Sequence, residues 1–171
     1  SLVAKKVSKY KHEQKVKVTI RYETTPGYQS QVDWKEKVVI ADKQGRTYTI
    51  NIFLMILGYS RMKFIKLTFD RTQKTLFECM TATFEYFKGT TEEILFDNMK
   101  TVVDHTKSDF NNVVINDNML KYAKDAGFTI RTCRAFRPET KGKVEILAKI
   151  TNRLKAYNNE FSNMKELEKI I

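Results

Sequence analysis

Cysteine and histidine are scarce in this sequence, and their scarcity argues against several kinds of site. The chain of 171 residues contains two of each. Cys79 and Cys133 lie far apart without CxxC spacing, which argues against a zinc knuckle or a disulfide framework and fits a reducing compartment. His12 lies in a basic stretch and His105 in a polar loop. Neither histidine is therefore a candidate for general acid or base catalysis.

Long hydrophobic runs are also missing. The longest strongly apolar stretch, INIFLMILG, ends at Gly58 and is far shorter than the roughly 20 residues that cross a bilayer. No stretch is typical of a signal peptide. The sequence therefore predicts no membrane span.

Acidic residues are outnumbered by basic ones. The 31 Lys and Arg against 20 Asp and Glu give a net charge of +11. Such a charge suits a polyanionic partner such as nucleic acid, although solvated basic faces are the alternative explanation. Basic residues are dense in residues 1–21, where Glu13 is the one acid, so this segment is predicted to be a basic arm or linker. The length and the 42% hydrophobic content predict one globular domain.

The hydrophobic periodicity predicts the order βββ-α-β-α-β-α. Strands are predicted at residues 30–40, 47–58, 61–69, 91–98 and 128–134, and helices at 72–88, 117–127 and 141–159. Gly89 is expected to cap the first helix at its C-terminus. One face of the last helix should carry Val144, Leu147, Ala148, Thr151 and Leu154.

This order predicts the fold class. Short links between the first three strands imply an antiparallel meander, because parallel neighbours need long crossovers. Strands joined through helices then continue the sheet. The expected fold is α/β, a mixed five-stranded sheet with helices on both faces, as in ribonuclease H-like proteins. The Rossmann alternative lacks its GxGxxG turn.

Three carboxylates stand at positions where this fold would gather them. Asp33 interrupts the apolar positions of the first strand, Asp97 ends the strand EILFD, and Glu145 lies one turn inside the last helix. Buried strands seldom carry unpaired carboxylates, and oxygen ligands favour Mg²⁺ or Mn²⁺. Glu139 is the rival third ligand, but it precedes Gly142 and is expected in the loop.

Each carboxylate also has an ordinary explanation. Asp33 could pair with Lys35 or Arg61, and Asp97 could cap the segment that follows it. Glu145 could form ion pairs with lysines four residues away on the same helix. The placement of all three acids in the expected elements, and in order, favours a metal site.

The segments around these acids resemble a known family. TTPGYQSQVDW, ILFDNMKTVV and FRPETKGKVE are similar to the three motifs of IstA-type insertion-sequence transposases, which belong to the retroviral-integrase-like DDE catalytic core superfamily. The resemblance covers roughly residues 21–160. The family's PGEQ is PGYQ here. The helix-turn-helix and C-terminal β-barrel-like modules of the full-length proteins are not readable in this chain.

The resemblance implies a DDE recombinase. Asp33, Asp97 and Glu145 would be its catalytic triad and would bind two divalent ions, Mg²⁺ or Mn²⁺. Water and then the freed 3′-hydroxyl of the element end would attack a DNA phosphodiester in line, without a covalent protein intermediate. The expected activity is DNA 3′-end cleavage followed by strand transfer.

Basic and polar residues near the acids are the candidate DNA contacts. Lys149 and Asn152 follow Glu145 on its helical face, where similar enzymes hold the DNA end. The full candidate set is Lys141, Lys143, Lys149, Asn152, Arg153 and Lys155 around the last helix, with Asn98 and Lys100 after the second acid.

The resemblance also implies partners and domain limits. The partners would be element-end DNA, target DNA, further copies of the chain and an AAA+ ATPase, in the bacterial cytoplasm. Residues 1–27 would form the linker, 28–160 the catalytic core and 161–171 the start of a connecting segment. A ribonuclease H-like nuclease that does not join DNA, and a catalytically silent DNA-binding or assembly module, are the alternatives.

Overall fold

The sheet has the mixed five-stranded topology that the sequence predicts. The computed structural model describes residues 24–105, 107, 113–132 and 141–169, with the side chains of 141–145 outside the described part. Its strand order is β3-β2-β1-β4-β5. The strands are β1 (Gln29–Ala41), β2 (Thr47–Leu57), β3 (Lys63–Thr68), β4 (Glu93–Phe96) and β5 (Thr129–Thr132). The first three pair antiparallel, and β4 and β5 continue from β1 in parallel.

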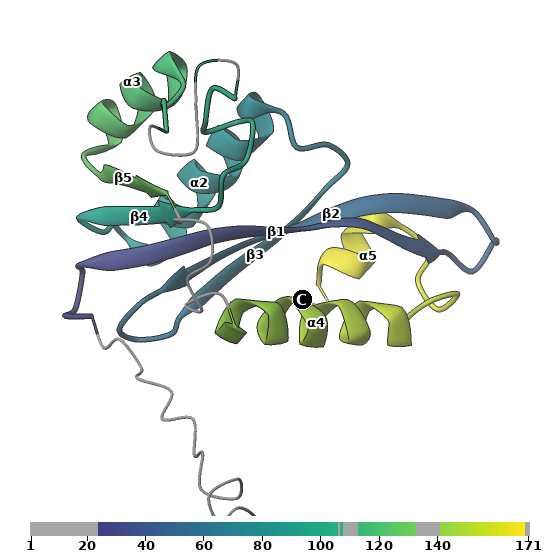
Figure 1. The fold of residues 1–171 in the computed structure, drawn as a ribbon. Helices are drawn as coiled ribbons and strands as arrows, with labels where there is room; N and C mark the ends of the chain where they lie inside the picture. Colours follow the sequence, from purple (N-terminus) through teal and green to yellow (C-terminus); the bar gives the residue numbers. More distant parts are fainter. Residues whose placement is uncertain (1–23, 106, 108–112, 133–140, 170–171) are drawn as a thin grey trace, which may run out of the picture.

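Helices cover both faces of the sheet (Figure 1). Helices α2 (Gln73–Phe87) and α3 (Asp117–Ala126) lie on one face, and α4 (Lys141–Ala156) and α5 (Met164–Glu168) on the other. We call the first packing layer the upper core and the second the lower core. The upper core includes Val32, Phe53, Met80, Phe96 and Met119. The lower core includes Ile40, Ile52, Leu54, Leu154 and Phe161.

The apolar run of β2 is explained by burial on both faces. Successive side chains of a strand point to opposite sides, so Phe53 and Met55 enter the upper core while Ile52 and Leu54 enter the lower core. The sequence of a strand that is buried on both faces is continuously apolar and does not alternate with polar residues. Full burial of each such side chain stabilises the fold by about 1.5–3 kcal/mol.

Strand β1 contains a bulge that changes which residues face each core. The register with β2 shifts between Lys35 and Val38, and Lys37 adopts a positive φ of 53°. Its amide donates to the Asn51 Oδ1 at 3.2 Å. Two residues of β1 thereby oppose one of β2, as in a β-bulge. The strand then continues with Val38 and Ile40 in the lower core.

Local capping sets the ends of the helices. Thr72 caps α2 by accepting from the Thr75 amide, and Lys88 ends the helix in the left-handed conformation at φ 60°. The cap residue is thus Lys88 rather than the predicted Gly89, whose amide instead donates to the Phe84 carbonyl. Asn116 caps the N-terminus of α3.

Helix α4 packs on the lower face of the sheet through a narrow apolar stripe. Leu147, Thr151 and Leu154 are buried, as their spacing predicts. Ala148, which was expected on the same face, is exposed. The side chain of Val144 lies outside the described residues.

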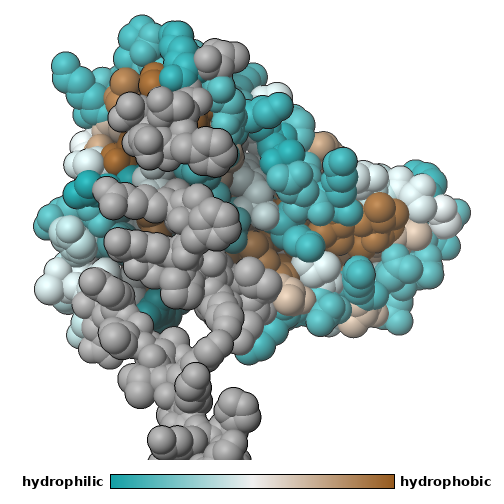
Figure 2. Space-filling model, viewed as in Figure 1, coloured by the Kyte–Doolittle hydropathy of each residue, from teal (hydrophilic) through white to brown (hydrophobic). Residues whose placement is uncertain are grey.

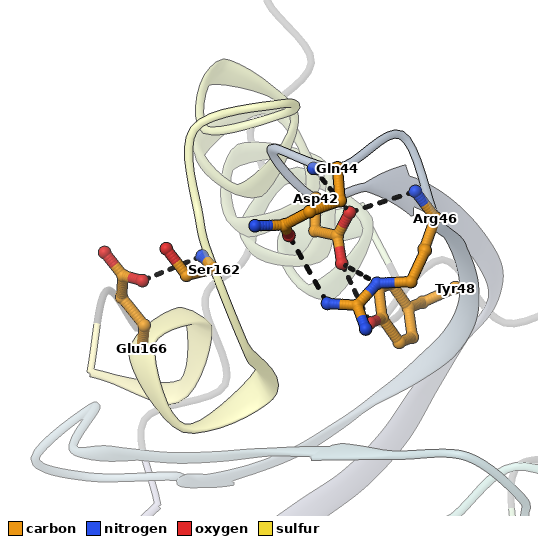
Figure 3. A network of polar contacts seen from close by, with 6 residues as sticks. All are labelled: Asp42, Gln44, Arg46, Tyr48, Ser162 and Glu166. Carbon is orange, nitrogen blue, oxygen red and sulfur yellow. Dashed lines mark hydrogen bonds and ion pairs between the residues drawn. The ribbon is translucent and has the colours of Figure 1, made fainter.

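The tip of the β1–β2 hairpin is organised around a buried carboxylate, Asp42 (Figure 3). It accepts hydrogen bonds from the Gln44 and Arg46 amides, from the Arg46 Nε at 2.7 Å and from the Tyr48 hydroxyl at 3.0 Å. Burial acts to raise the pKa of Asp42, but these hydrogen bonds outweigh it and lower the pKa below its ordinary value. The ionised form of Asp42 therefore stabilises the folded state.

The segment after α4 is fastened to this hairpin tip. The Asn158 side-chain oxygen accepts from the Ala41 amide at 2.7 Å, and the Phe161 carbonyl accepts from the Lys43 amide at 2.9 Å. The Phe161 ring is buried and contacts Tyr48, with 6.0 Å between the ring centroids. The hairpin tip and the chain beyond α4 thus form one packed unit.

Candidate active site

Asp33 lies on β1, on the face of the sheet that carries α4. Its partner across the β1–β2 ladder is Leu54, and directly opposed residues share a face. Since Leu54 belongs to the lower core, Asp33 faces the same side. The side chain is half-buried, and its Oδ1 accepts from the Trp34 amide at 2.8 Å.

Asp97 lies beside Asp33 at the end of the neighbouring parallel strand. The β1–β4 register ends at the pair Val32 and Phe96, and each of these residues is followed by an aspartate. Neighbouring strands are about 4.8 Å apart. Phe96 faces the upper core, and successive residues of a strand face opposite sides. If this alternation continues for one residue, half-buried Asp97 faces the same side as Asp33.

Glu145 lies in the first turns of α4, the helix that packs on this face. Its side chain lies outside the described residues, as does the rival Glu139. Among the residues that the structure does describe, no group of three Asp, Glu, His or Cys side chains could hold a metal ion. A carboxylate inside β1 and another just after the end of β4 nevertheless match the oxygen ligands that Mg²⁺ and Mn²⁺ prefer.

The predicted DNA contacts fall into two groups along the chain. Lys149, Asn152, Arg153 and Lys155 are exposed on α4, and Asn98 and Lys100 are exposed on the turn after Asp97. The side chains of Lys141 and Lys143 lie outside the described part of the chain. Hydrophilic residues predominate over α4, whereas hydrophobic ones gather over the outer part of the β1–β2 hairpin (Figure 2). The polar helix face suits contact with an anionic ligand.

Trp34, next to the first acid, packs in the interior as the sequence predicts. Its ring meets Phe53 edge to face, with 5.2 Å between the ring centroids, and it borders the upper core. The indole therefore supports β1 from the face opposite Asp33.

A polar network that contacts the turn after Asp97 was not predicted from the sequence. The Gln73 Nε2 donates to the Thr101 carbonyl at 2.9 Å and to the Asn116 Oδ1 at 3.0 Å. Its Oε1 accepts from the Asn118 Nδ2 at 3.2 Å. These partners lie 28 to 45 residues away in the sequence, so no local pattern indicates them.

A second carboxylate network lies at the opposite end of the parallel strands. Buried Glu93 accepts from the Gln29 Nε2 at 2.6 Å and from the Arg131 Nε at 2.9 Å. Burial acts to raise the pKa of Glu93, but the bonds from Arg131 and Gln29 lower it overall. The Glu93–Arg131 ion pair joins β4 to β5, and the hydrogen bond from Gln29 joins β1 to β4. It is structural support rather than part of the candidate site.

The described chain also contains a groove of about 660 Å³ lined by α2 residues and Asn118. It contains neither Asp33 nor Asp97 and lies along the upper helices. No helix within the described residues is long and apolar enough to span a membrane.

Comparison with protein families gives a direct match. Residues 23–138 match the family described as the integrase core domain. The chain is 39% identical over 145 residues to the transposase for insertion sequence element IS232 of Bacillus thuringiensis subsp. berliner, covering 85% of this chain and 34% of that protein.

Two further relatives are similar over much the same region. A putative transposase for IS5376 of Geobacillus stearothermophilus is 45% identical, covering 77% of this chain and 32% of that protein. The transposase for IS21 of Pseudomonas aeruginosa is 35% identical, covering 78% and 33%. The chain spans about a third of the length of these curated relatives.

Solved retroviral structures share the fold. A chain of the simian T-cell lymphotropic virus intasome, in complex with PP2A regulatory subunit B56 gamma, superposes with a TM-score of 0.61 at 14% identity, covering 85% of this chain and 47% of that one. The HTLV-2 integrase catalytic core domain in complex with magnesium gives 0.57 at 13% identity, covering 86% and 84%. At such low identity the likeness concerns the fold alone.

Proposed function

Because the chain belongs to the integrase core domain family, and within it to the IS21/IstA-type insertion-sequence transposases, we propose that it is the catalytic core of a DDE transposase. Its reaction would be cleavage at the 3′ ends of the element and transfer of those ends to target DNA. The observation that carries this proposal is the placement of Asp33 and Asp97 one residue beyond the last β1–β4 pair, on the face covered by α4.

Asp33, Asp97 and Glu145 would hold two Mg²⁺ or Mn²⁺ ions. The fit rests on the oxygen donors and half-buried positions of the two aspartates, and the HTLV-2 core of the same fold is a magnesium complex. When bound, such ions activate the attacking oxygen and stabilise the charge of the leaving oxygen and phosphoryl group.

The remaining chemistry needs little from the protein. The DNA 3′-hydroxyl attacks the phosphorus in line, a new P–O bond forms, and the target strand leaves with its own 3′-oxygen while the proton passes to solvent. We assign no general base to a side chain. Of the two histidines, His105 is exposed and His12 lies outside the described residues.

DNA would be held by the basic and polar residues around the acids. We propose Lys149, Asn152, Arg153 and Lys155 along α4, Lys141 and Lys143 before them, and Asn98 and Lys100 after the second acid. The net charge of +11 favours approach of the polyanion. Exposed Lys149 and Asn152 lie four and seven residues after Glu145, on one helical face.

We propose the partners and the domain limits from the resemblance to the family. The full protein would bind element-end and target DNA in the bacterial cytoplasm, assemble with further copies of itself, and work with an AAA+ ATPase. We place the catalytic core at residues 28–160, after a basic linker at 1–27 and before a connecting segment that starts at 161.

A branched DNA substrate tests the proposed reaction on the chain itself. Its 3′-hydroxyl and scissile phosphodiester are held together by base pairing, so the assay does not depend on assembly of a synaptic complex. With Mn²⁺ we expect a joined strand of new length. Cut strands without joining would support the nuclease alternative, and binding without any cleavage would support the silent DNA-binding module.

A further inference from the structure

Gln73 connects three segments that are distant in the sequence. It is the first residue of α2, and its side-chain amide contacts the Thr101 carbonyl, the Asn116 side chain and the Asn118 side chain. Both amide hydrogens and the amide oxygen are thereby used. A half-buried glutamine with every contact directed away from its own helix calls for an explanation beyond helix formation.

The helix caps are satisfied without Gln73. Thr72 accepts from the Thr75 amide at the start of α2, and Asn116 accepts from the Asn118 amide at the start of α3. These two bonds supply the usual N-cap stabilisation. The bond from Gln73 to Thr101 is thus additional, and its target is the turn that follows Asp97.

That turn is fixed at both of its ends. At its start the Met99 amide donates to the Asp97 carbonyl at 2.6 Å. At its end the Val102 and Val103 amides both donate to the Met99 carbonyl at 2.9 Å, and both valines are buried in the upper core. The Thr101 carbonyl lies between these points, where Gln73 holds it.

We infer that Gln73 is a positioning residue for Asp97, acting through the turn of residues 97–103. This inference rests on the proposed function, in which the Asp97 carboxylate binds a metal ion. Metal-binding groups must be held to within about 0.5 Å of their working geometry. Because Asp97 lies just past the last ladder pair of β4, its placement depends on the turn as well as on the strand.

The test compares Gln73→Met with Lys74→Met. The first variant keeps the side-chain length but removes the three hydrogen bonds. The second places the same methionine on the next residue, whose side chain is 87% exposed. Two measurements are made on the 171-residue chain: amide hydrogen exchange of residues 98–103, and the Kd for Mn²⁺ without DNA.

We expect faster exchange at Val102 and Val103 in Gln73→Met, and a Kd for Mn²⁺ raised about 10-fold or more, the usual effect of removing support for a ligand. Lys74→Met should match the unchanged chain in both. A Gln73→Met chain with unaltered exchange, or with a lower Tm but an unaltered Kd for Mn²⁺, overturns the inference.

The two proposals fail in different ways. If the unchanged chain binds no Mn²⁺ or joins no branched DNA, the proposed function is contradicted. Exchange at residues 98–103 then still decides whether Gln73 holds the turn. If the unchanged chain binds Mn²⁺ and joins branched DNA, but residues 98–103 exchange at the same rate in Gln73→Met, then only the proposed role of Gln73 is contradicted.

Discussion

Val32 and Phe96 form the last registered pair of β1 and β4, and an aspartate follows each of them. Parallel pairing therefore brings Asp33 and Asp97 to the same level of the sheet. Both acids are half-buried, and carboxylate oxygens are the ligands that divalent cations such as Mg²⁺ prefer. The fold thus places two carboxylates that are 64 positions apart in the sequence on one face of the sheet.

Asp97→Asn should abolish strand transfer without unfolding the chain. The amide has the size of the carboxylate but lacks the charge that binds a divalent ion. Removing outer support alone costs about 10–100-fold, so loss of a ligand should lower joining of branched DNA by at least about 100-fold. Asp125→Asn, an exposed change on α3, is the matched control. Joining by a folded Asp97→Asn chain would remove this residue from the site.

Lys149→Ala should weaken DNA binding without changing the fold. The side chain is exposed on α4, and a lost phosphate contact reduces the slope of log K against log salt by about 0.9. Binding of an element-end duplex is measured over a series of salt concentrations. Lys121→Ala, exposed on α3, should leave the slope unaltered, and an equal effect of both variants would contradict a specific contact.

The contribution of Asp42 to stability should depend on pH. Its pKa in the folded chain lies below the ordinary 3.8, so the contribution is complete above that value. It is lost as the pH falls through the lowered folded pKa. The difference in free energy of unfolding between the unchanged chain and Asp42→Asn should therefore be largest near neutral pH and shrink below about pH 4. Asp125→Asn is the reference, and a difference independent of pH would contradict the assignment.

Phe161→Ala should destabilise the chain strongly. The ring is 1% exposed in the lower core, and truncating a buried phenylalanine costs about 3–5 kcal/mol. Urea unfolding gives the free energy. Tyr157→Ala, at a residue 37% exposed, should cost much less. A small effect of Phe161→Ala would show that the chain beyond α4 contributes little to the folded core.

The strands and the two aspartates could be predicted because their signals are local. Apolar periodicity located all five strands, and an aspartate inside an otherwise apolar strand is conspicuous. The bulge in β1 was not predicted. The run Val38–Val39–Ile40 reads as buried on both sides, yet Val39 is 57% exposed, because the hairpin extends beyond the upper helices (Figure 1).

The supporting networks could not be predicted because their partners are distant. The stretch ADKQGR indicated only a turn, although its Asp42 is fully buried. Its neighbour Lys43 donates its amide to the carbonyl of Phe161, a residue from the far end of the chain. In the sequence Gln73 is an ordinary helical residue, and only the structure shows that its side chain donates to the Thr101 carbonyl. Periodicity says nothing about such contacts.

The separation of the two cores has a consequence for how the chain is made. Among the residues that the structure describes, the upper core draws on none later than 130, whereas the lower core needs α4, Phe161 and Leu167. During synthesis from the N-terminus, the first core can assemble while Ile40, Ile50 and Ile52 still face water. The bond between Ala41 and Asn158 joins residues 117 positions apart and closes only at the end. A nascent chain paused before α4 therefore presents a bare aliphatic sheet, the surface that chaperones or a neighbouring nascent chain would meet first.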